Sequence, residues 1–401
     1  MLDKKIVIGI LVFVFLISGF ASYSYFSNSK GGGFLSPLSN YTAPKSNGNG
    51  TTDVTVPSEP KTEECPINGE MLTKTQKVKW VTRRPLGVMI ENHKEARPQS
   101  GISSADVVYE VVAEGGITRF MALFYCKDAS YIGPVRSARV YFMSMLQEYG
   151  NYPLYAHVGG ANCDAETGSG CANGAPADAL GIIRKLDWDS YNDMNQFAVP
   201  FPYYWRDPER LPGVANEHTV YSSTSKLWQY AKEKRGLSNV DEKGVAWNKE
   251  FVSWKFRDDA PIAERGAINR IEFGFWPQSI ADFGVVWAYN KATNSYTRAN
   301  GGVAHFDKNT SKPLETKNVV ILFAKESPAN DGYEGGHLIY KVTGTGDAII
   351  FQDGKAIDAT WSKIDPKTRI KFTDNKSSKE ISVVRGQVFI EIIPIGNKVT
   401  Y

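Results

Sequence analysis

Two arginines at the expected start of a helix are well suited to bind an anion. In the segment Arg136-Ser137-Ala138-Arg139, Ser137 is a suitable N-cap, and apolar side chains at helical spacing follow it, which predicts a helix over residues 138–149. Cations in a first turn oppose the helix dipole, whereas free backbone N–H groups and two guanidinium forks suit a phosphate or carboxylate. The alternative is that Arg136 or Arg139 pairs with a nearby Asp or Glu.

A second group of charges lies on a predicted hairpin. Residues 106–126 contain two β-rich runs joined by Gly115-Gly116, which favours a two-residue turn. The regular register places Val112 opposite Arg119. Four charged side chains then share one face: Asp106, Glu110, Glu114 and Arg119. Asp106 and Glu110 are candidate ligands for a hard divalent cation, with Arg119 positioning it or an anion. The alternative is a solvated face with cross-strand ion pairs.

Histidines, glycines and a further arginine complete the candidate binding residues. His157 precedes Gly159-Gly160 at the end of a predicted strand, and glycine lets backbone approach a ligand closely. His218 lies beside Glu217, and Arg206 follows a run of aromatic residues able to stack on a sugar. Each has a structural alternative, a satisfied histidine or a core aromatic cluster. No catalytic set can be read around either histidine, so binding is favoured over catalysis.

These residues should meet in one place. Arg119 lies on the strand that precedes the helix start, and a short turn-containing connection joins the two. We therefore expect Arg119, Arg136 and Arg139 to converge on one cleft, with the Gly159-Gly160 loop at its side. The expected ligand is a phosphorylated anion. No cofactor is predicted beyond a divalent cation.

Two regions with different patterns position these side chains. Residues 75–245 alternate strand-like and helix-like segments, which predicts an α/β domain. Residues 246–401 contain short β-rich runs separated by turns, including Asp353-Gly354, which predicts a mainly antiparallel β domain. The expected fold class is α+β, preceded by a transmembrane helix.

An uncharged apolar segment at residues 6–26 is long enough to span a bilayer as a helix. Lys4 and Lys5 precede it, so residues 1–5 are expected in the cytoplasm and the rest of the chain outside it. A cleaved signal peptide is the alternative. Residues 27–74, dominated by small and polar side chains in their first part, are expected to be a disordered linker.

Composition limits the partners. The formal net charge is only +3, with 46 basic and 43 acidic residues, which argues against nucleic acid. The chain has four cysteines, an even number suited to an oxidising compartment. Cys163 and Cys171 bracket a short polar loop and are predicted to be bonded. Pairing of Cys65 with Cys126 stays open, because a buried thiol at a strand end also explains Cys126.

Three sequence motifs resemble the YerB-like family of bacterial envelope lipoproteins. They are RPLGVMIENHKEARPQSGISSADVVYE, EGGITRFMALFY and IGPVRSARVYF, with DGKAIDATW and GQVFIEIIP in the C-terminal part. The resemblance implies a two-domain α+β ectodomain attached to a bacterial membrane, with no established biochemical role. This chain lacks the lipoprotein cysteine near the end of the apolar segment, so the segment itself is the expected anchor.

A weaker resemblance is to the LytR-CpsA-Psr family, which transfers glycopolymers from polyprenyl pyrophosphate carriers. LGVMIEN, SADVVYE, IGPVRSAR and YAHVGGA are similar to segments of that family. However, Ala105 replaces a motif Ser and no Asp follows Arg136. The leading hypothesis is therefore an envelope protein that binds an anionic wall precursor. The alternatives are a transferase of that type and a scaffold for cell-wall synthesis proteins.

Overall fold

The computed structural model describes residues 59–401. Three predicted segments lie wholly or mostly outside the described residues: the cytoplasmic N-terminus (1–5), the membrane span (6–26) and the linker (27–74). Within the described range, no helix combines the length and the apolar character needed to cross a membrane. The described structure starts inside the predicted linker range, with β1 (Lys61–Glu64) paired to β2 (Met71–Thr73).

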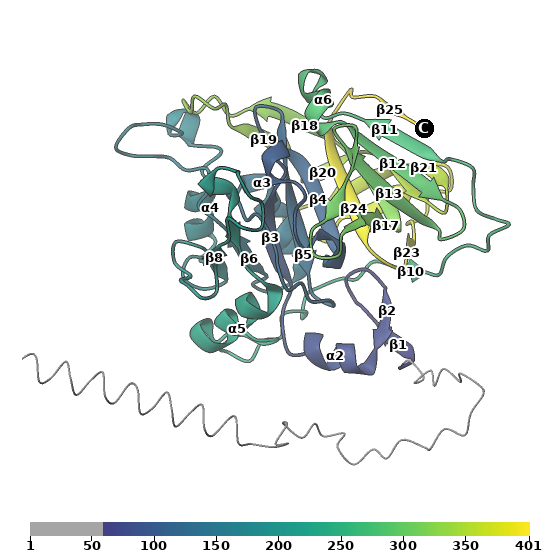
Figure 1. The fold of residues 1–401 in the computed structure, drawn as a ribbon, viewed down its shortest axis with the longest axis horizontal. Helices are drawn as coiled ribbons and strands as arrows, with labels where there is room; N and C mark the ends of the chain where they lie inside the picture. The colour runs from purple at the N-terminus through teal and green to yellow at the C-terminus, as the bar shows by residue number, and fades with distance from the viewer. Residues whose placement is uncertain (1–58) are drawn as a thin grey trace, which may run out of the picture. The chain divides into compact units, whose positions relative to one another are not determined.

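One mixed sheet of eleven strands organises the molecule (Figure 1). Its order is β22 (Lys371–Asp374), β21 (Lys355–Lys363), β20 (Gly344–Gln352), β18 (Asn318–Pro328), β24 (Val388–Pro394), β4 (Val107–Glu114), β5 (Ile117–Phe124), β3 (Leu86–Glu91), β6 (Leu154–His157) and β7 (Asp193–Asn195), with β19 (Leu338–Lys341) paired to β18. β24 is parallel to both β18 and β4. Strands from both sides of the predicted boundary at residue 245 therefore share one sheet and one core.

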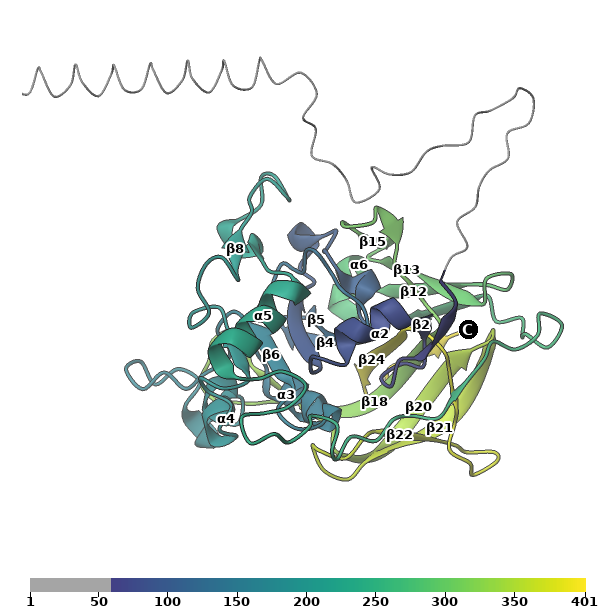
Figure 2. The same cartoon turned by 90° about the horizontal axis from the view of Figure 1, so that it is seen from below.

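A second, six-stranded sheet covers one face of the large sheet (Figure 2). It contains β14 (Val303–Ala304), β13 (Ser295–Asn300), β12 (Val285–Asn290), β11 (Arg270–Phe273), β25 (Val399–Thr400) and β17 (Glu315–Thr316). Its pairs are antiparallel, and the ring of Trp287 lies 5.0 Å from that of Phe389 on β24. The described chain is thus α+β, as predicted.

Short two-stranded pairs complete the β structure. They are β8 (Trp205–Arg206) with β9 (Val220–Tyr221), β10 (Phe256–Arg257) with β23 (Val383–Val384), and β15 (Phe306–Asp307) with β16 (Lys312–Pro313). β10 pairs with β23 in parallel, so it attaches the chain just after residue 245 to a segment near its C-terminus.

The helices are short. They are α2 (Lys74–Trp80), α3 (Val140–Leu146), α4 (Ala179–Lys185), α5 (Thr224–Arg235) and α6 (Ile280–Phe283). α3 packs on the large sheet opposite the second sheet, where the Tyr141 hydroxyl donates to the Val112 carbonyl at 2.9 Å. The predicted N-cap Ser137 is wrong: Arg139 is the N-cap residue and makes no side-chain cap. Ser137 lies two residues before this N-cap, and its carbonyl accepts from Arg119.

The β4–β5 hairpin has the predicted turn but not the predicted register. Arg119 faces Val111 and Glu110 faces Phe120, because the register shifts at a bulge between Val112 and Glu114. Glu110 consequently points toward the second sheet, whereas Arg119 lies on the α3 face. The prediction that the four charges share one face is therefore wrong. One extra residue moves Glu114 to the arginine side, since side chains alternate along a strand.

Buried ionic groups join the earlier and later parts of the chain. Glu148, in the short helix η3 (Gln147–Tyr149), accepts from Lys363 Nζ at 2.7 Å and from Arg369. All three side chains are at most 2% exposed. On the other face, Arg298 of β13 binds Glu110 of β4. Both groups connect strands or helices that are far apart in the sequence.

All four cysteines are paired. Cys163–Cys171 is bonded with a Cα–Cα distance of 4.5 Å, which confirms the prediction. Cys65 and Cys126 also form a disulfide, with a Cα–Cα distance of 6.0 Å. The second bond attaches the segment between β1 and β2 to the end of β5.

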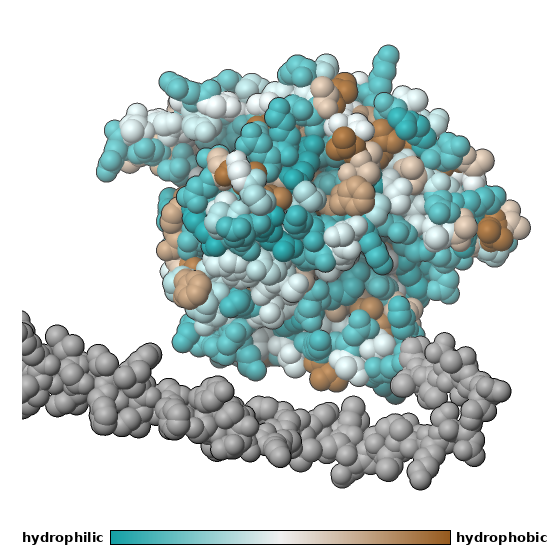
Figure 3. All heavy atoms as spheres, in the orientation of Figure 1, coloured by the Kyte–Doolittle hydropathy of each residue, from teal (hydrophilic) through white to brown (hydrophobic). Residues whose placement is uncertain are grey.

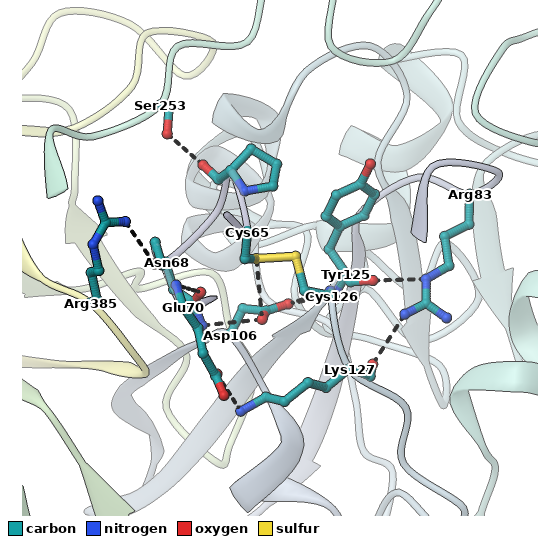
Figure 4. Close-up of a disulfide and its surroundings, with 12 residues drawn as sticks. Cys65, Asn68, Glu70, Arg83, Asp106, Tyr125, Cys126, Lys127, Ser253 and Arg385 are labelled. Atoms are coloured by element: carbon teal, nitrogen blue, oxygen red, sulfur yellow. Dashed lines mark hydrogen bonds and ion pairs between the residues drawn. A yellow bond between two sulfur atoms is a disulfide. The ribbon is translucent and has the colours of Figure 1, made fainter. Parts of the chain in front are cut away.

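Asp106 lies buried beside this disulfide (Figure 4). Its carboxylate accepts from the backbone N–H of Tyr125 at 2.6 Å and of Cys126 at 3.0 Å, and from the Asn68 side chain at 3.2 Å. Burial raises the pKa of Asp106 to about 6, although Lys127 and these N–H groups act against the rise.

Because its pKa is raised, we expect Asp106 to contribute less to the stability of the folded protein at neutral pH than at acidic pH. An unfolded Asp titrates near 3.9, so between about pH 4 and pH 6 the native state binds the extra proton and stability falls as pH rises. The stability difference between wild type and Asp106→Asn should therefore be larger at pH 4 than at pH 7 by on the order of 2–3 kcal/mol. Urea unfolding at both pH values measures it. Asp347→Asn, at an exposed position, is the control, and equal differences at both pH values would contradict the assignment.

Candidate anion-binding site

Four strands of the large sheet end at the same edge. β3, β4, β6 and β7 run in one direction, because β5 is antiparallel to both β3 and β4 and the other pairs are parallel. Their last residues are Glu91, Glu114, His157 and Asn195. In open sheets of this kind, ligands commonly bind beyond the carboxyl ends of the strands. We refer to this place as the carboxyl edge.

The three predicted arginines lie on one face at the carboxyl edge. Arg119 is directly opposite Glu91 in the β3–β5 register, and its Nη2 lies 3.6 Å from Glu114. Arg139 also pairs with Glu114. Arg136 Nε lies 3.1 Å from Glu91 Oε1. Arg119 and Arg139 thus share Glu114, and Arg136 pairs with Glu91, so the ion pairing left open by the sequence is present. Of the three arginines, only Arg139 lines the cavity described next.

The arginines at the carboxyl edge contact three carboxylates. Arg119 and Arg139 share Glu114, and Arg136 contacts both Glu91 and the more exposed Glu217. Burial lowers the pKa of Arg119 and of Arg139, although both remain cationic at neutral pH. The Nε atoms of these two arginines are buried without a hydrogen-bond partner. Unpaired buried donors are costly, and an anion that accepts from them would offset that cost.

A cavity of about 310 Å³ opens beside Arg139. It is lined by Glu114, Ser137, Arg139, Gly160, Ala161, Asn162, Asp164, Ser169, Tyr333 and His337. The last two residues come from the segment between β18 and β19, far along the chain. Its walls offer hydroxyl, amide and guanidinium groups, which can donate to a phosphate or carboxylate, and also the carboxylates of Glu114 and Asp164.

The glycine loop is held by protein contacts. His157 donates or accepts through both ring nitrogens, at 2.7 Å to the Gly159 carbonyl and 2.6 Å to Asp193. Gly159 has a φ of +56°, which suits glycine. A side chain on Gly160 would meet Leu180 of α4 at 3.0 Å and Ala138, before α3, at 3.1 Å, so the loop is packed closely against both segments. His157 therefore does not line the cavity itself but holds the loop whose Gly160 does.

His218 and Arg206 lie outside the cavity lining. His218 is buried in the short helix η5 (Asn216–His218), and its Nδ1 lies 2.8 Å from Glu91 Oε2. Arg206 donates to the Asn216 carbonyl and to Thr219, so it holds the segment that carries His218. His218 thus contacts the carboxyl edge by its hydrogen bond to Glu91. Arg206 makes no such contact and only holds the segment on which His218 lies.

Asp106 and Glu110, the candidate cation ligands, lie away from the cavity. Asp106 precedes β4 and is therefore at the opposite end of that strand from Glu114. Glu110 accepts from Asn92 at 3.0 Å, from Thr118 at 2.6 Å and from Arg298. Both carboxylates are fully buried and already bonded to protein donors.

Two comparisons with known proteins bear on this chain as a whole. A relative named "Putative lipoprotein YerB", from Bacillus subtilis (strain 168), is 29% identical over 343 residues, covering 84% of this chain and 88% of the relative. The crystal structure of YerB from Bacillus subtilis matches with a TM-score of 0.65 and 26% identity, covering 84% of this chain and 100% of that one.

Family models agree with these matches. The description "Protein of unknown function (DUF3048) N-terminal domain" matches residues 72–238, and the corresponding C-terminal domain matches residues 276–390. Together the two ranges cover more than half of the chain. The chain belongs to the YerB-like family. The resemblance to the LytR-CpsA-Psr family gains no support from these matches.

Sequence reasoning on this YerB-like chain missed several residues of the carboxyl edge. Glu91, His93 and Glu95 follow one another at alternate positions where β3 ends, and this spacing of titratable side chains was a readable signal. Tyr333 and His337 had no such signal, because they reach the cavity only through the pairing of β18 with β19.

Proposed function

We propose that this YerB-like protein is a bacterial envelope protein, held at the membrane by residues 6–26, that binds a phosphorylated cell-wall precursor at the carboxyl edge. The N-terminus faces the cytoplasm and the folded part lies outside it. The observation that carries the binding proposal is the pairing of Arg119 and Arg139 with a single carboxylate, Glu114, beside the cavity.

Exposed aromatic side chains near the edge favour an amphiphilic ligand. Phe197 is 77% exposed and Phe201 is 79% exposed, both in the segment that follows β7. The Phe197 ring lies against Gly159, since a side-chain carbon placed there would be 3.3 Å from it. An anion site next to exposed rings suits a phosphate attached to a lipid or sugar, because aromatic surfaces cover apolar chains and sugar faces.

The proposal predicts opposite effects for two substitutions. Glu114→Gln should strengthen binding of inorganic pyrophosphate, because it frees two guanidinium groups from their shared carboxylate. Arg139→Gln should weaken binding by on the order of 1–3 kcal/mol, because a charge-assisted contact is lost. Isothermal titration of the full chain in detergent measures both. A loss of folding cannot produce the gain expected for Glu114→Gln.

The matched control is Arg136→Ala. Arg136 pairs with Glu91 and with Glu217 and does not line the cavity, so its replacement should have the smaller effect. Weaker binding in Glu114→Gln, or no binding to the wild type, would overturn the proposal. Mass spectrometry of ligands purified with the wild type, compared with Arg139→Gln, then identifies the natural anion.

The two alternatives find less support. A transferase of the LytR-CpsA-Psr type requires Asp106 to meet the arginines, but Asp106 lies about 26 Å along β4 from Glu114. A scaffold requires a broad exposed apolar patch. On the face drawn in Figure 3, apolar side chains of the described residues form small groups among polar ones.

A further inference from the structure

A cluster of two histidines and a glutamate lies where β3 ends, outside the anion cavity. His93, Glu95 and His218 each present a ligand atom, and these atoms lie within 4.8 Å of one another. His218 Nε2 is 3.6 Å from Glu95 Oε2. Two ligands on a tetrahedral metal with bonds of 2.0–2.1 Å are about 3.3 Å apart, so the pair is close to the required separation.

A second carboxylate orients one of the histidines. Glu91 Oε2 lies 2.8 Å from Nδ1 of His218 and accepts a hydrogen bond from it, so in the neutral ring Nε2, which is 3.6 Å from Glu95, is the nitrogen that can bind a metal. A carboxylate behind a histidine is the arrangement that sets the tautomer of metal-binding imidazoles. His218 is only 4% exposed, so the ring has little freedom to turn away.

The segment that carries the other two ligands is also held in place. Asn92, directly before His93, is fully buried and donates to Thr118 at 2.7 Å and Asn300 at 3.0 Å. Arg97, two residues after Glu95, donates to the Asn92 side chain at 2.9 Å. Both ends of the segment are thus fixed by buried bonds, and preorganised ligands reduce the entropy lost on binding.

We propose that His93, Glu95 and His218 bind one Zn²⁺ ion. Two imidazoles and one carboxylate are a ligand set suited to zinc, and three protein ligands leave a fourth position for water. The Glu95 side chain is 53% exposed, so that position is open to solvent. Glu91 connects the ion to Arg136 and hence to the carboxyl edge. The other cluster with metal-ligand types, Cys65, Asp106 and Cys126, is unsuitable because its sulfurs are bonded to each other.

Zinc titration of the full chain in detergent, against a chromophoric chelator, tests the proposal. The wild type should bind one equivalent of Zn²⁺ and prefer it to Mg²⁺, which selects oxygen ligands. His93→Gln and Glu95→Gln should each lower the affinity at least about tenfold. Both positions are at least partly exposed, so these variants should fold, whereas His218→Gln alone could fail to do so.

Glu264→Gln, at an exposed position outside the cluster, should leave zinc binding unchanged. Zinc should also raise the Tm of the wild type and not that of His93→Gln, since a ligand that binds only the native state stabilises it. The proposal is overturned if the wild type binds no zinc, if Mg²⁺ competes equally, or if both substitutions leave the affinity unchanged. No anion is present in the assay, so its outcome is independent of the proposed ligand binding.

Discussion

Replacing Glu148 with glutamine is expected to lower the free energy of unfolding by about 3–5 kcal/mol, because it leaves two buried cations without their counter-charge. Lys363 and Arg369 both bind this carboxylate, and the Ile370 N–H donates to it at 3.2 Å. Burial alone would raise the pKa of Glu148, but Lys363 and Arg369 outweigh it and hold the pKa below its usual value.

The sign of this pKa shift fixes the pH dependence. A depressed carboxyl pKa stabilises the native state above the unfolded value near 4.3, and the contribution is lost as the pH falls through the lower native value. The difference between wild type and Glu148→Gln should therefore shrink below about pH 4. Urea unfolding measures it, with Glu264→Gln as the control. A loss under about 1 kcal/mol at pH 7 would show that the cations find other partners.

Removal of the Cys65–Cys126 disulfide is expected to cost about 4 kcal/mol. The bond closes a loop of 61 residues, and its loss restores that entropy to the unfolded chain. Denaturant unfolding of Cys65→Ala with Cys126→Ala, compared with the wild type, measures the effect.

The other disulfide supplies a matched control. Cys163 and Cys171 are separated by 8 residues, so the same double replacement there should cost only about 2.5 kcal/mol. The larger loop must therefore give the larger loss. The reverse order would mean that contacts around the sulfurs, and not loop closure, determine the contribution of each bond.

Local signals in the sequence predicted local elements well. α5 has Ser223 as N-cap and Gly236 in the left-handed conformation at its end, and both residue types mark helix ends in a sequence. The Gly115-Gly116 pair also predicted its turn correctly, and both glycines have the positive φ that such a turn requires. Each signal depends on residues within one turn of the element, so tertiary structure had little influence on it.

Non-local pairing set the limit of prediction. The bulge near Ala113 changed which face carries Glu114, and nothing in the hairpin sequence indicated it. Arg119, Arg136 and Arg139 were expected in one cleft; all three are at the carboxyl edge, but only Arg139 lines the cavity. Glu91, the carboxylate partner of Arg136, was missed, because it comes from β3, which precedes the hairpin in sequence and pairs with β5 in the large sheet.

The position of β24 has a consequence for how the chain folds. This strand comes from residues 388–394 but separates β18 from β4 in the large sheet. Until those residues have been synthesised, β4 has an edge of unpaired backbone N–H and C=O groups, and such edges promote aggregation. The strands of the large sheet therefore cannot all pair in the order in which they are synthesised, because β4 must wait for β24. Contacts of such large sequence separation also slow folding, so this edge stays open until β24 is available to pair with β4.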